Sequence, residues 1–399
     1  MLHYSYIQTA ITKPRFPDYL LMLILLCVSG NPVFMTSSLF SRIACGVVLG
    51  FVLLCYAHRI PYVAVRRIGR WSLFLGAIFS AQLILFNSSI IPASVNYIVK
   101  LALAILVAYI LRANFGVVYL KVISGLALVS IVFFCLNVVG IVFPPLVAID
   151  TSGDSLVFYN QMINTQTGLV RNAGMFWEPG AFAGYLILAF LPYTNHMSFL
   201  WARYRWRVIV ILVALLTTLS TTGYIVCFIL FITQLSVSVR NKWTMLLVYI
   251  VSIPLAIYAY FNLEFLNDKI SDELERTSEM TAQDINFSRT GSMIFDWHYI
   301  RKHPIIGNGL VMSTRYADHL GYYDADDLDA FSNGFTGNIA CLGITFMLAY
   351  LATIYRNRTI YFRKIVILIV VLLLQGEYFL NYPMFMTLPF IDYNFIKDR

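Results

Sequence analysis

The sequence predicts an all-α polytopic membrane protein with about 11–12 transmembrane helices. Of its 399 residues, 59% are hydrophobic and only 12% are charged, whereas soluble domains carry about 25% charged residues. Several apolar runs also approach or exceed the roughly 18 residues with which an α-helix crosses a bilayer. We therefore expect a lipid bilayer around most of the chain.

The apolar runs divide the chain into eleven candidate spans and a weaker twelfth. The spans are 18–36, 39–57, 71–91, 93–111, 117–143, 180–200, 206–220, 222–239, 244–262, 335–355 and 364–380, with the twelfth at 382–396. The interval 206–239 is long for one helix and short for two. Because arginines flank both of its ends, we favour a helical hairpin that bends at S-T-T-G, residues 220–223.

Two long external loops divide the chain into five parts. These parts are N-terminal membrane helices (1–143), a first external loop (144–179), further membrane helices (180–262), a large external loop (263–334) and C-terminal membrane helices (335–399). The large loop holds thirteen acidic and six basic residues. We expect it to be helical over 264–280 and again from Ser288, a suitable N-cap, to Lys302, where Pro304 stops the helix.

Most positive charges of the chain lie in the short connections between spans. The net charge is +8 at pH 7. The basic clusters are Lys13 and Arg15; Arg59, Arg66, Arg67 and Arg70; Arg112 and Lys121; Arg203, Arg205 and Arg207; Arg240 and Lys242; Arg356, Arg358, Arg363 and Lys364; and Lys397 and Arg399. Since such residues gather in cytoplasmic loops, we expect a cytoplasmic N-terminus and two outward-facing long loops. No basic helix or aromatic platform stands outside the spans, which argues against nucleic-acid binding.

The stretch R-N-A-G-M-F-W-E-P-G-A-F-A-G-Y-L, residues 171–186, places Arg171 and Glu178 directly before a span. Proline suits the first turn of a helix, so Pro179 fixes Glu178 at or near a helix N-terminus. One interpretation is an interfacial acid that the helix macrodipole favours by ~0.3–1 kcal/mol. The other is a functional pair of charges at the membrane surface. The spacing alone leaves both open.

A second group of polar residues lies in the helix expected to end at Lys302. Four of its residues share one side at helical spacing. They are Arg289, Ser292, Asp296 and Tyr299. A surface ion pair of Asp296 with Arg289 or Arg301 would account for this face without a function. The run that follows, H-P-I-I-G-N-G-L, ends the helix and turns, and it lacks the spacing of a phosphate-binding loop.

The spans hold few charged residues, and Lys100 and Glu377 are the clear cases. A charge at the centre of a transmembrane helix costs ~2.5–3.5 kcal/mol on insertion scales. We therefore expect each to have a partner or an aqueous cavity, although Glu377, near the outer end of its span, can also reach the interface. A transporter would place more such groups at mid-membrane depth.

Metal and hydrolase motifs are absent from the sequence. The acidic run D-A-D-D-L-D, 324–329, has Asp329 and Phe335 where an EF-hand needs Gly and Glu. The histidines form no H-E-x-x-H pair and no nucleophilic-serine motif is present. The six cysteines lie in apolar segments without a C-x-x-C pair. We expect no metal and no cofactor.

Five stretches, in order along the chain, carry a resemblance to a known family. They are the stretch 171–186, L-S-T-T-G-Y-I (219–225), H-P-I-I-G-N-G-L (303–310), F-S-N-G-F-T-G-N-I-A-C-L-G-I (331–344) and L-L-L-Q-G-E-Y-F-L-N-Y-P-M-F (372–385). Together with the large outer loop, they resemble the Wzy-type polysaccharide polymerases of bacteria. These enzymes share a superfamily of GT-C-type glycosyltransferases with the O-antigen ligases. The resemblance covers about residues 165–390, and the preceding part matches only as a series of spans.

The resemblance implies polymerisation of O-antigen, capsular or exopolysaccharide repeat units at the outer, periplasmic face of the bacterial cytoplasmic (inner) membrane. A growing glycan passes from its undecaprenyl diphosphate carrier to a sugar hydroxyl of a second lipid-linked unit, with inversion and without a metal. Arg171 and Arg289 would bind the diphosphate leaving group as forked donors, and Glu178 would be the general base. A chain-length-regulating co-polymerase is a possible further partner.

One position departs from the ligase branch of that superfamily. Ligases typically carry a His-Asn pair before the late span, where this chain has Ser332-Asn333. The missing histidine favours a polymerase and leaves the base role to Glu178 or His319. Asn333 either orients an acceptor sugar or caps the helix that starts near Gly334. The candidates for substrate binding are Asn333, His319 and His303.

Two alternative functions stay open at this point. The first is an O-antigen ligase of the same superfamily. The second is a lipid-linked oligosaccharide flippase or another transporter, for which we would expect basic residues lining a cavity inside the spans.

Overall fold

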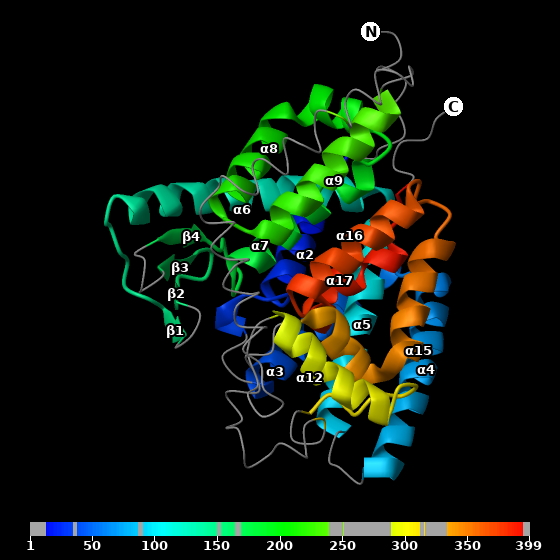
Figure 1. The fold of residues 1–399 in the computed structure, drawn as a ribbon. Helices are drawn as coiled ribbons and strands as arrows, with labels where there is room; N and C mark the ends of the chain where they lie inside the picture. The colour runs from blue at the N-terminus through cyan, green and yellow to red at the C-terminus, as the bar shows by residue number, and fades with distance from the viewer. Residues whose placement is uncertain are drawn as a thin grey trace.

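The computed structural model describes residues 13–34, 38–86, 91–149, 153–163, 169–238, 250, 289–311, 315 and 333–393. Most of these residues are helical (Figure 1). The helices of the first half are α2 (Phe16–Cys27), α3 (Ser38–Tyr56), α4 (Tyr62–Phe86), α5 (Ile91–Leu111), α6 (Phe115–Val138) and α7 (Pro179–Leu188). Those of the second half are α8 (Met197–Thr217), α9 (Thr221–Ser238), α12 (Arg289–Lys302), α15 (Gly334–Arg356), α16 (Arg363–Gly376) and α17 (Pro383–Met386).

Four helical stretches of the described residues are long and apolar enough to cross a membrane. They are Leu39–Arg59, Tyr62–Leu85, Ile91–Val138 and Gly334–Arg356. The third comprises α5 and α6, and α6 lies crosswise to α4 and α5 in the view of Figure 1. Large apolar side chains such as Leu54 and Leu73 stay exposed on these helices. The protein is therefore a mostly helical membrane protein.

Three of the predicted spans are broken early, and one of them, 364–380, ends at Gly376 after the fourteen residues of α16. In 18–36, α2 ends at Cys27, because the following S-G-N-P turn ends in Asn31-Pro32 and a residue before proline avoids the helical region. In 180–200, α7 ends at Leu188 after ten residues and a 3-10 turn follows at Leu191–Tyr193. Both α2 and α7 are too short to cross a bilayer as straight helices.

The predicted twelfth span, 382–396, is not a continuous helix in its described part. Pro383 begins the four residues of α17, and a 3-10 turn follows at Leu388–Phe390. Pro389 lacks the N–H that a continuing helix would need. These apolar residues are buried, so their composition reflected a core position rather than a span.

The interval 206–239 forms two helices, which confirms the hairpin favoured by the flanking arginines. Helix α8 ends at Thr217, α9 begins at Thr221, and Leu219 between them has a φ of 49°. Helix α8 begins earlier than expected and bends at Tyr204. The span expected at 244–262 and the helix at 264–280 lie outside the described residues, so the total of 11–12 spans stays a prediction.

A small antiparallel sheet, which the sequence did not predict, occupies the first external loop. Its strands are β1 (Val147–Ile149), β2 (Gly153–Ser155), β3 (Asn160–Ile163) and β4 (Val170–Asn172), paired in that order. Arg171 lies opposite Met162 in the β3–β4 pair. The strands have three or four residues each, too few for a clear alternation of apolar and polar side chains.

The run H-P-I-I-G-N-G-L packs into a break in α15. Gly343 has a φ of 81°, which favours glycine, and a Cβ there would collide with the carbonyl of Ile305. The backbone N–H of Asn308 donates to Ala340 O at 2.7 Å, and the Gln82 side chain donates to carbonyls on both sides. Two stretches far apart in the sequence therefore form one packing unit beside α12, whose bounds confirm the helix expected over 288–302.

Candidate functional site

Glu178 stands at the N-terminus of α7, as the Pro-Gly pair predicts. It is the N-cap residue with extended backbone (φ −146°, ψ 154°), and Pro179 begins the helix. Its side chain is partly buried and does not cap the helix. Within the part of the chain that the structure describes, the Glu178 carboxylate has no hydrogen-bonding or ion-pair partner. The helix start therefore fixes the backbone of Glu178, while its carboxylate makes no capping hydrogen bond to α7.

A second carboxylate, that of Glu377, lies beside the same helix end. Glu377 follows α16 and is only 6% exposed. Its Oε2 accepts a hydrogen bond of 3.1 Å from Trp177 Nε1, and a Cβ on Gly180 would lie 2.6 Å from its Oε1. Glu377 thus touches residues on both sides of Glu178. The partner expected for this charge is therefore Trp177.

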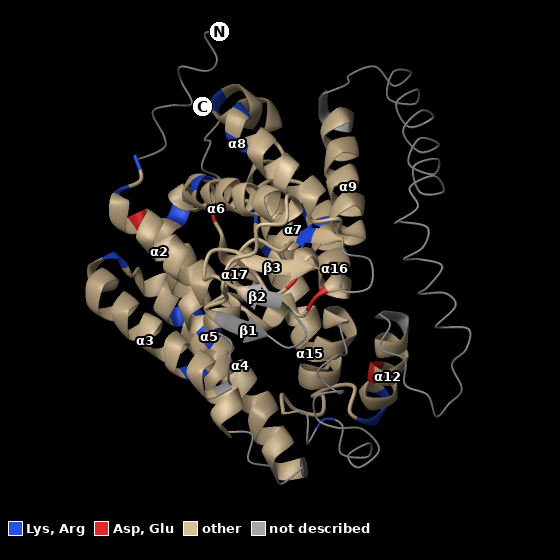
Figure 2. Cartoon of the chain, turned by 90° about the vertical axis from the view of Figure 1, so that its left-hand side faces the viewer, with Lys and Arg blue, Asp and Glu red and all other residues tan. Residues whose placement is uncertain are grey.

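Three helix N-termini meet at this corner, which we call the junction. Helix α7 reaches it through Gly180, and α9 through Thr222, whose Oγ1 would lie 3.5 Å from a Cβ on Gly376. Helix α15 reaches it through Gly334, where a Cβ would collide with the Glu377 carbonyl. Figure 2 shows acidic positions where α7, α15 and α16 approach one another. Asn333 and Ser220 already accept hydrogen bonds from first-turn N–H groups of α15 and α9, but each helix start still carries a positive partial charge, so the junction favours bound anions.

Arg171 borders the junction from strand β4. Its Nε donates to Thr218 O at 3.3 Å and its terminal nitrogen to Leu219 O at 3.1 Å. These carbonyls follow the end of α8, where a cation is favoured, and Thr222 of the junction lies three residues further on. The neighbouring Asn172 side chain donates to Ser130 Oγ at 3.1 Å and to Thr217 Oγ1 at 2.9 Å. The guanidinium is thus held in one place by the β4–α8 contact.

An aromatic pair connects the junction to Lys100. The Trp177 ring lies 4.5 Å from the Tyr382 ring, and Lys100 Nζ lies 5.9 Å from the centre of the Tyr382 ring. The expectation of a partner for this intramembrane charge is therefore met by an aromatic face. No sequence pattern assigned a role to Trp177, Tyr382 or Thr222. The signal was present, since all three lie in stretches that carry the family resemblance.

Helix α12 turns its polar face inwards. Ser292 and Asp296 are fully buried and Tyr299 is 2% exposed, whereas Trp297 is 54% exposed. Asp296 Oδ2 accepts a hydrogen bond of 2.7 Å from Thr336 Oγ1 in the first turn of α15. The face shared by Ser292, Asp296 and Tyr299 was predicted correctly, but the surface position expected for Asp296 was wrong, because Asp296 is buried against α15. Arg289 opens α12, and its side chain lies outside what the structure describes.

The three candidates for substrate contact have different surroundings. Asn333 is buried and caps α15, its Oδ1 accepting 3.1 Å hydrogen bonds from the N–H groups of Phe335 and Thr336. Of the two roles considered for Asn333, the structure contains the cap. His303 is partly buried just after α12, and burial, followed by the charge of Lys302, lowers its pKa below the usual value. His319 lies outside the described residues.

The described residues contain no group of three His, Cys, Asp or Glu side chains placed to hold a metal ion, and the acidic run 324–329 falls outside them. Comparisons of the chain with models of protein families, with curated proteins and with solved structures find no match. A function for this chain therefore has to be inferred from the geometry of the junction and from the sequence.

Proposed function

We propose that the chain is a glycosyltransferase of the Wzy type, which joins undecaprenyl-diphosphate-linked repeat units into a polysaccharide at the outer face of the bacterial cytoplasmic membrane. One observation carries the proposal. The Glu178 carboxylate has no partner among the described residues, yet it stands where three helix N-termini and a buried acid come together, and Arg171 is held on the carbonyls just before one of these helices, α9. Three stretches of the resemblance meet there, because Glu178, Thr222 and Glu377 belong to different ones.

The positive side of the junction suits a diphosphate leaving group. When the bond from the anomeric carbon to the diphosphate breaks, negative charge grows on a phosphate oxygen. The positive ends of α7, α9 and α15 and the guanidinium of Arg171 would stabilise this charge. Arg289, as the family pattern implies, would supply a second guanidinium from α12. No metal is needed for this charge stabilisation.

Glu178 suits the role of general base. In the proposed step the acceptor hydroxyl oxygen attacks the anomeric carbon from the face opposite the diphosphate. The carbon–oxygen bond to the diphosphate breaks, undecaprenyl diphosphate leaves with the electron pair, and the hydroxyl proton passes to Glu178. The anomeric centre is inverted. A base for this step has to lie within hydrogen-bond reach of the hydroxyl, and Pro179 and the buried neighbour Glu377 fix the backbone of Glu178.

Glu377 and Trp177 act as positioning residues in this proposal. Their hydrogen bond ties the end of α16 to the residue before Glu178. The buried carboxylate also lies next to Gly180, in the first turn of α7. Both contacts hold the N-terminal turn of α7 at the junction, so the Glu178 side chain is presented from a rigid element.

A deletion strain tests the proposal at the level of the cell. For a polymerase, loss of the gene leaves a single repeat unit attached to the lipopolysaccharide core, and wild-type protein restores the ladder of lengths. Loss of a ligase instead leaves bare core, and loss of a flippase blocks export altogether. Either of these two patterns would overturn the assignment. Cysteine labelling near residues 171 and 289 from outside the membrane checks the orientation, and labelling only from the cytosol would contradict it.

A further inference from the structure

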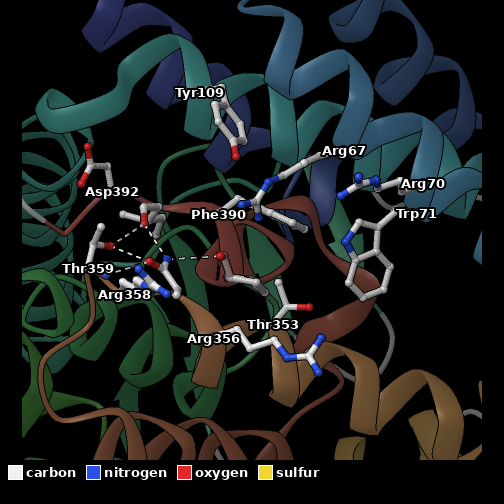
Figure 3. Close-up of a pocket in the computed structure, with 13 residues that line it drawn as sticks. Arg67, Arg70, Trp71, Tyr109, Thr353, Arg356, Arg358, Thr359, Phe390 and Asp392 are labelled. Carbon is white, nitrogen blue, oxygen red and sulfur yellow. Dashed lines mark hydrogen bonds between the residues drawn. The ribbon is translucent and has the colours of Figure 1, made fainter.

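A second charged region lies about one helix length from the junction. Helix α16 begins at Arg363 and ends at Gly376 in the junction, and its fourteen residues span about 21 Å at a rise of 1.5 Å per residue. Near its start, a cavity of about 640 Å³ lies between α4, α5, α15 and the final described residues (Figure 3). Four arginines line the cavity, which we call the arginine pocket: Arg67, Arg70, Arg356 and Arg358.

The four guanidinium groups have no acidic partner in the part of the chain that the structure describes. Arg59, in the turn before α4, provides the contrast, because it binds Asp18 Oδ1 at 2.7 Å. Asp392 is the one acidic residue among the described residues that line the pocket. Four positive charges therefore face a single negative one, and their mutual repulsion favours a bound anion.

The walls of the arginine pocket are held in place. The Arg67 guanidinium lies 5.8 Å from the centre of the Tyr109 ring and 5.9 Å from that of Phe390, so two aromatic faces fix its position. Asn357 Nδ2 donates to Ile391 O at 2.9 Å, which ties the connection after α15 to the final described segment. An anion would therefore meet at least one ordered donor, Arg67, on a fixed backbone, which lowers the entropic cost of binding, whereas Arg70, Arg356 and Arg358 are exposed.

The size and surroundings of the pocket favour a phosphate group attached to a lipid. Forked arginines match phosphate oxygens, and a cavity of this volume has room for more than a bare ion. Apolar side chains are exposed beside it: Leu73, 77% exposed, lies one turn from Arg70, and Leu348, 60% exposed, lies two turns before Arg356. A ligand with a charged head and apolar tails fits both surfaces.

We propose that the arginine pocket binds the phosphate-bearing headgroup of an anionic membrane lipid, with the acyl chains lying along α4 and α15. The pocket belongs to the arginine-rich end of these helices, where the sequence predicts the cytoplasmic side, and basic pockets between membrane helices are suited to such headgroups. The site does not depend on the proposed polymerase activity, since none of the junction residues lines it.

Binding is tested with full-length protein purified in a neutral detergent. Cardiolipin, phosphatidylglycerol, phosphatidylcholine and inorganic diphosphate are each titrated, and thermal unfolding and lipid retention by native mass spectrometry are measured. We expect the two anionic lipids to raise the unfolding temperature and to be retained, while phosphatidylcholine does neither. Diphosphate should bind more weakly and compete with cardiolipin. Diphosphate binding without lipid retention would overturn the lipid as the occupant.

Substitutions of the pocket arginines test whether these residues bind the lipid. Arg67→Gln with Arg356→Gln should weaken cardiolipin binding about 100-fold, because each of the two lost charge-assisted contacts is worth about one order of magnitude. Arg358→Gln, on an exposed connection, should weaken it less and is a second test if the double variant does not fold. Arg66→Gln is the matched control, since Arg66 is exposed next to Arg67 but does not line the pocket. Equal loss in the control and the pocket variants would overturn the proposal.

Discussion

The junction and the arginine pocket hold their charges in different ways. At the junction, the charged groups of Glu377 and Arg171 are each bound by protein donors or acceptors, and Glu178 alone presents a carboxylate with no partner among the described residues. At the arginine pocket, four guanidinium groups lack an acidic partner in the same part of the chain.

This difference indicates which kind of ligand each region would bind. Placing a charge in or near a membrane is costly unless something binds it. Glu178 has no partner among the described residues and lies next to helix N-termini, so its carboxylate is suited to proton transfer to or from a ligand. Several unused arginines around a cavity suit a multiply charged anion instead. The comparison thus assigns chemistry to one region and anion binding to the other.

The contrast between the two regions depends most on Glu178 being needed for chain extension. We expect Glu178→Gln to lower chain extension by about 100-fold or more, the usual contribution of a general base. The fold should survive, because no described residue hydrogen-bonds to this carboxylate. Ladder length and membrane abundance in a complemented deletion strain measure the two effects. Glu264→Gln, the same change in the large external loop, is the control, and wild-type ladders from Glu178→Gln would remove Glu178 as the base.

The next largest effect concerns the fork of Arg171. We expect Arg171→Lys to lower the rate of extension by purified protein about 10- to 100-fold, since an ammonium cannot replace a fork that also binds two backbone carbonyls. Initial rates over a range of donor concentrations show whether substrate binding or turnover suffers. Arg66→Lys, on an exposed part of α4, should keep the full rate. Full activity of Arg171→Lys would make Arg171 a structural residue.

A third prediction sharpens the geometry of the junction without touching its charges. A Cβ at Gly334 would collide with the backbone of Glu377, whereas one at Gly50 in α3 meets nothing within 4 Å. We expect Gly334→Ala to lower the free energy of unfolding by about 1–3 kcal/mol through overpacking. Gly50→Ala should be neutral or slightly stabilising. Thermal unfolding in detergent compares the two, and equal stabilities would mean that α15 and α16 do not meet as described.

The smallest effect concerns the attachment of α12 to the junction. Thr336→Val removes the hydroxyl that donates to buried Asp296 and should cost about 1 kcal/mol of unfolding free energy. Thr233→Val is the control, since Thr233 Oγ1 donates to Ile229 O within its own helix. Chemical denaturation of the two variants gives the comparison. If Thr336→Val loses no more unfolding free energy than the control, the hydrogen bond to Asp296 does not hold α12 at the junction.

Sequence patterns predicted the parts of the molecule that depend on local rules. Pro179 placed Glu178 at a helix start, and Pro304 set the end of α12, because proline acts within a turn of its own position. Apolar runs were less reliable: 382–396 was predicted as a span, yet its described residues belong to the interior. Hydrophobicity alone does not separate lipid contact from burial inside the protein.

The contacts that build the site depend on residues far apart in the chain. The bond between Trp177 and Glu377 joins positions 200 residues apart, and no spacing rule reaches that distance. The break at Gly343 looked like an ordinary glycine in an apolar run until Ile305 was seen against it. Asp296 looked like a surface acid because its partner, Thr336, comes from another helix. These three features needed the tertiary structure.

The most direct test of Glu178-dependent polymerisation is extension of a single repeat unit by the purified protein. Wild-type protein in lipid is incubated with one synthetic undecaprenyl-diphosphate-linked repeat unit, and products are separated by length. We predict that the wild-type protein makes a ladder of longer glycans and releases undecaprenyl diphosphate. With Glu178→Gln, only the starting unit should remain. A wild-type protein that leaves the unit unextended, or a Glu178→Gln variant that makes the same ladder, would contradict this prediction.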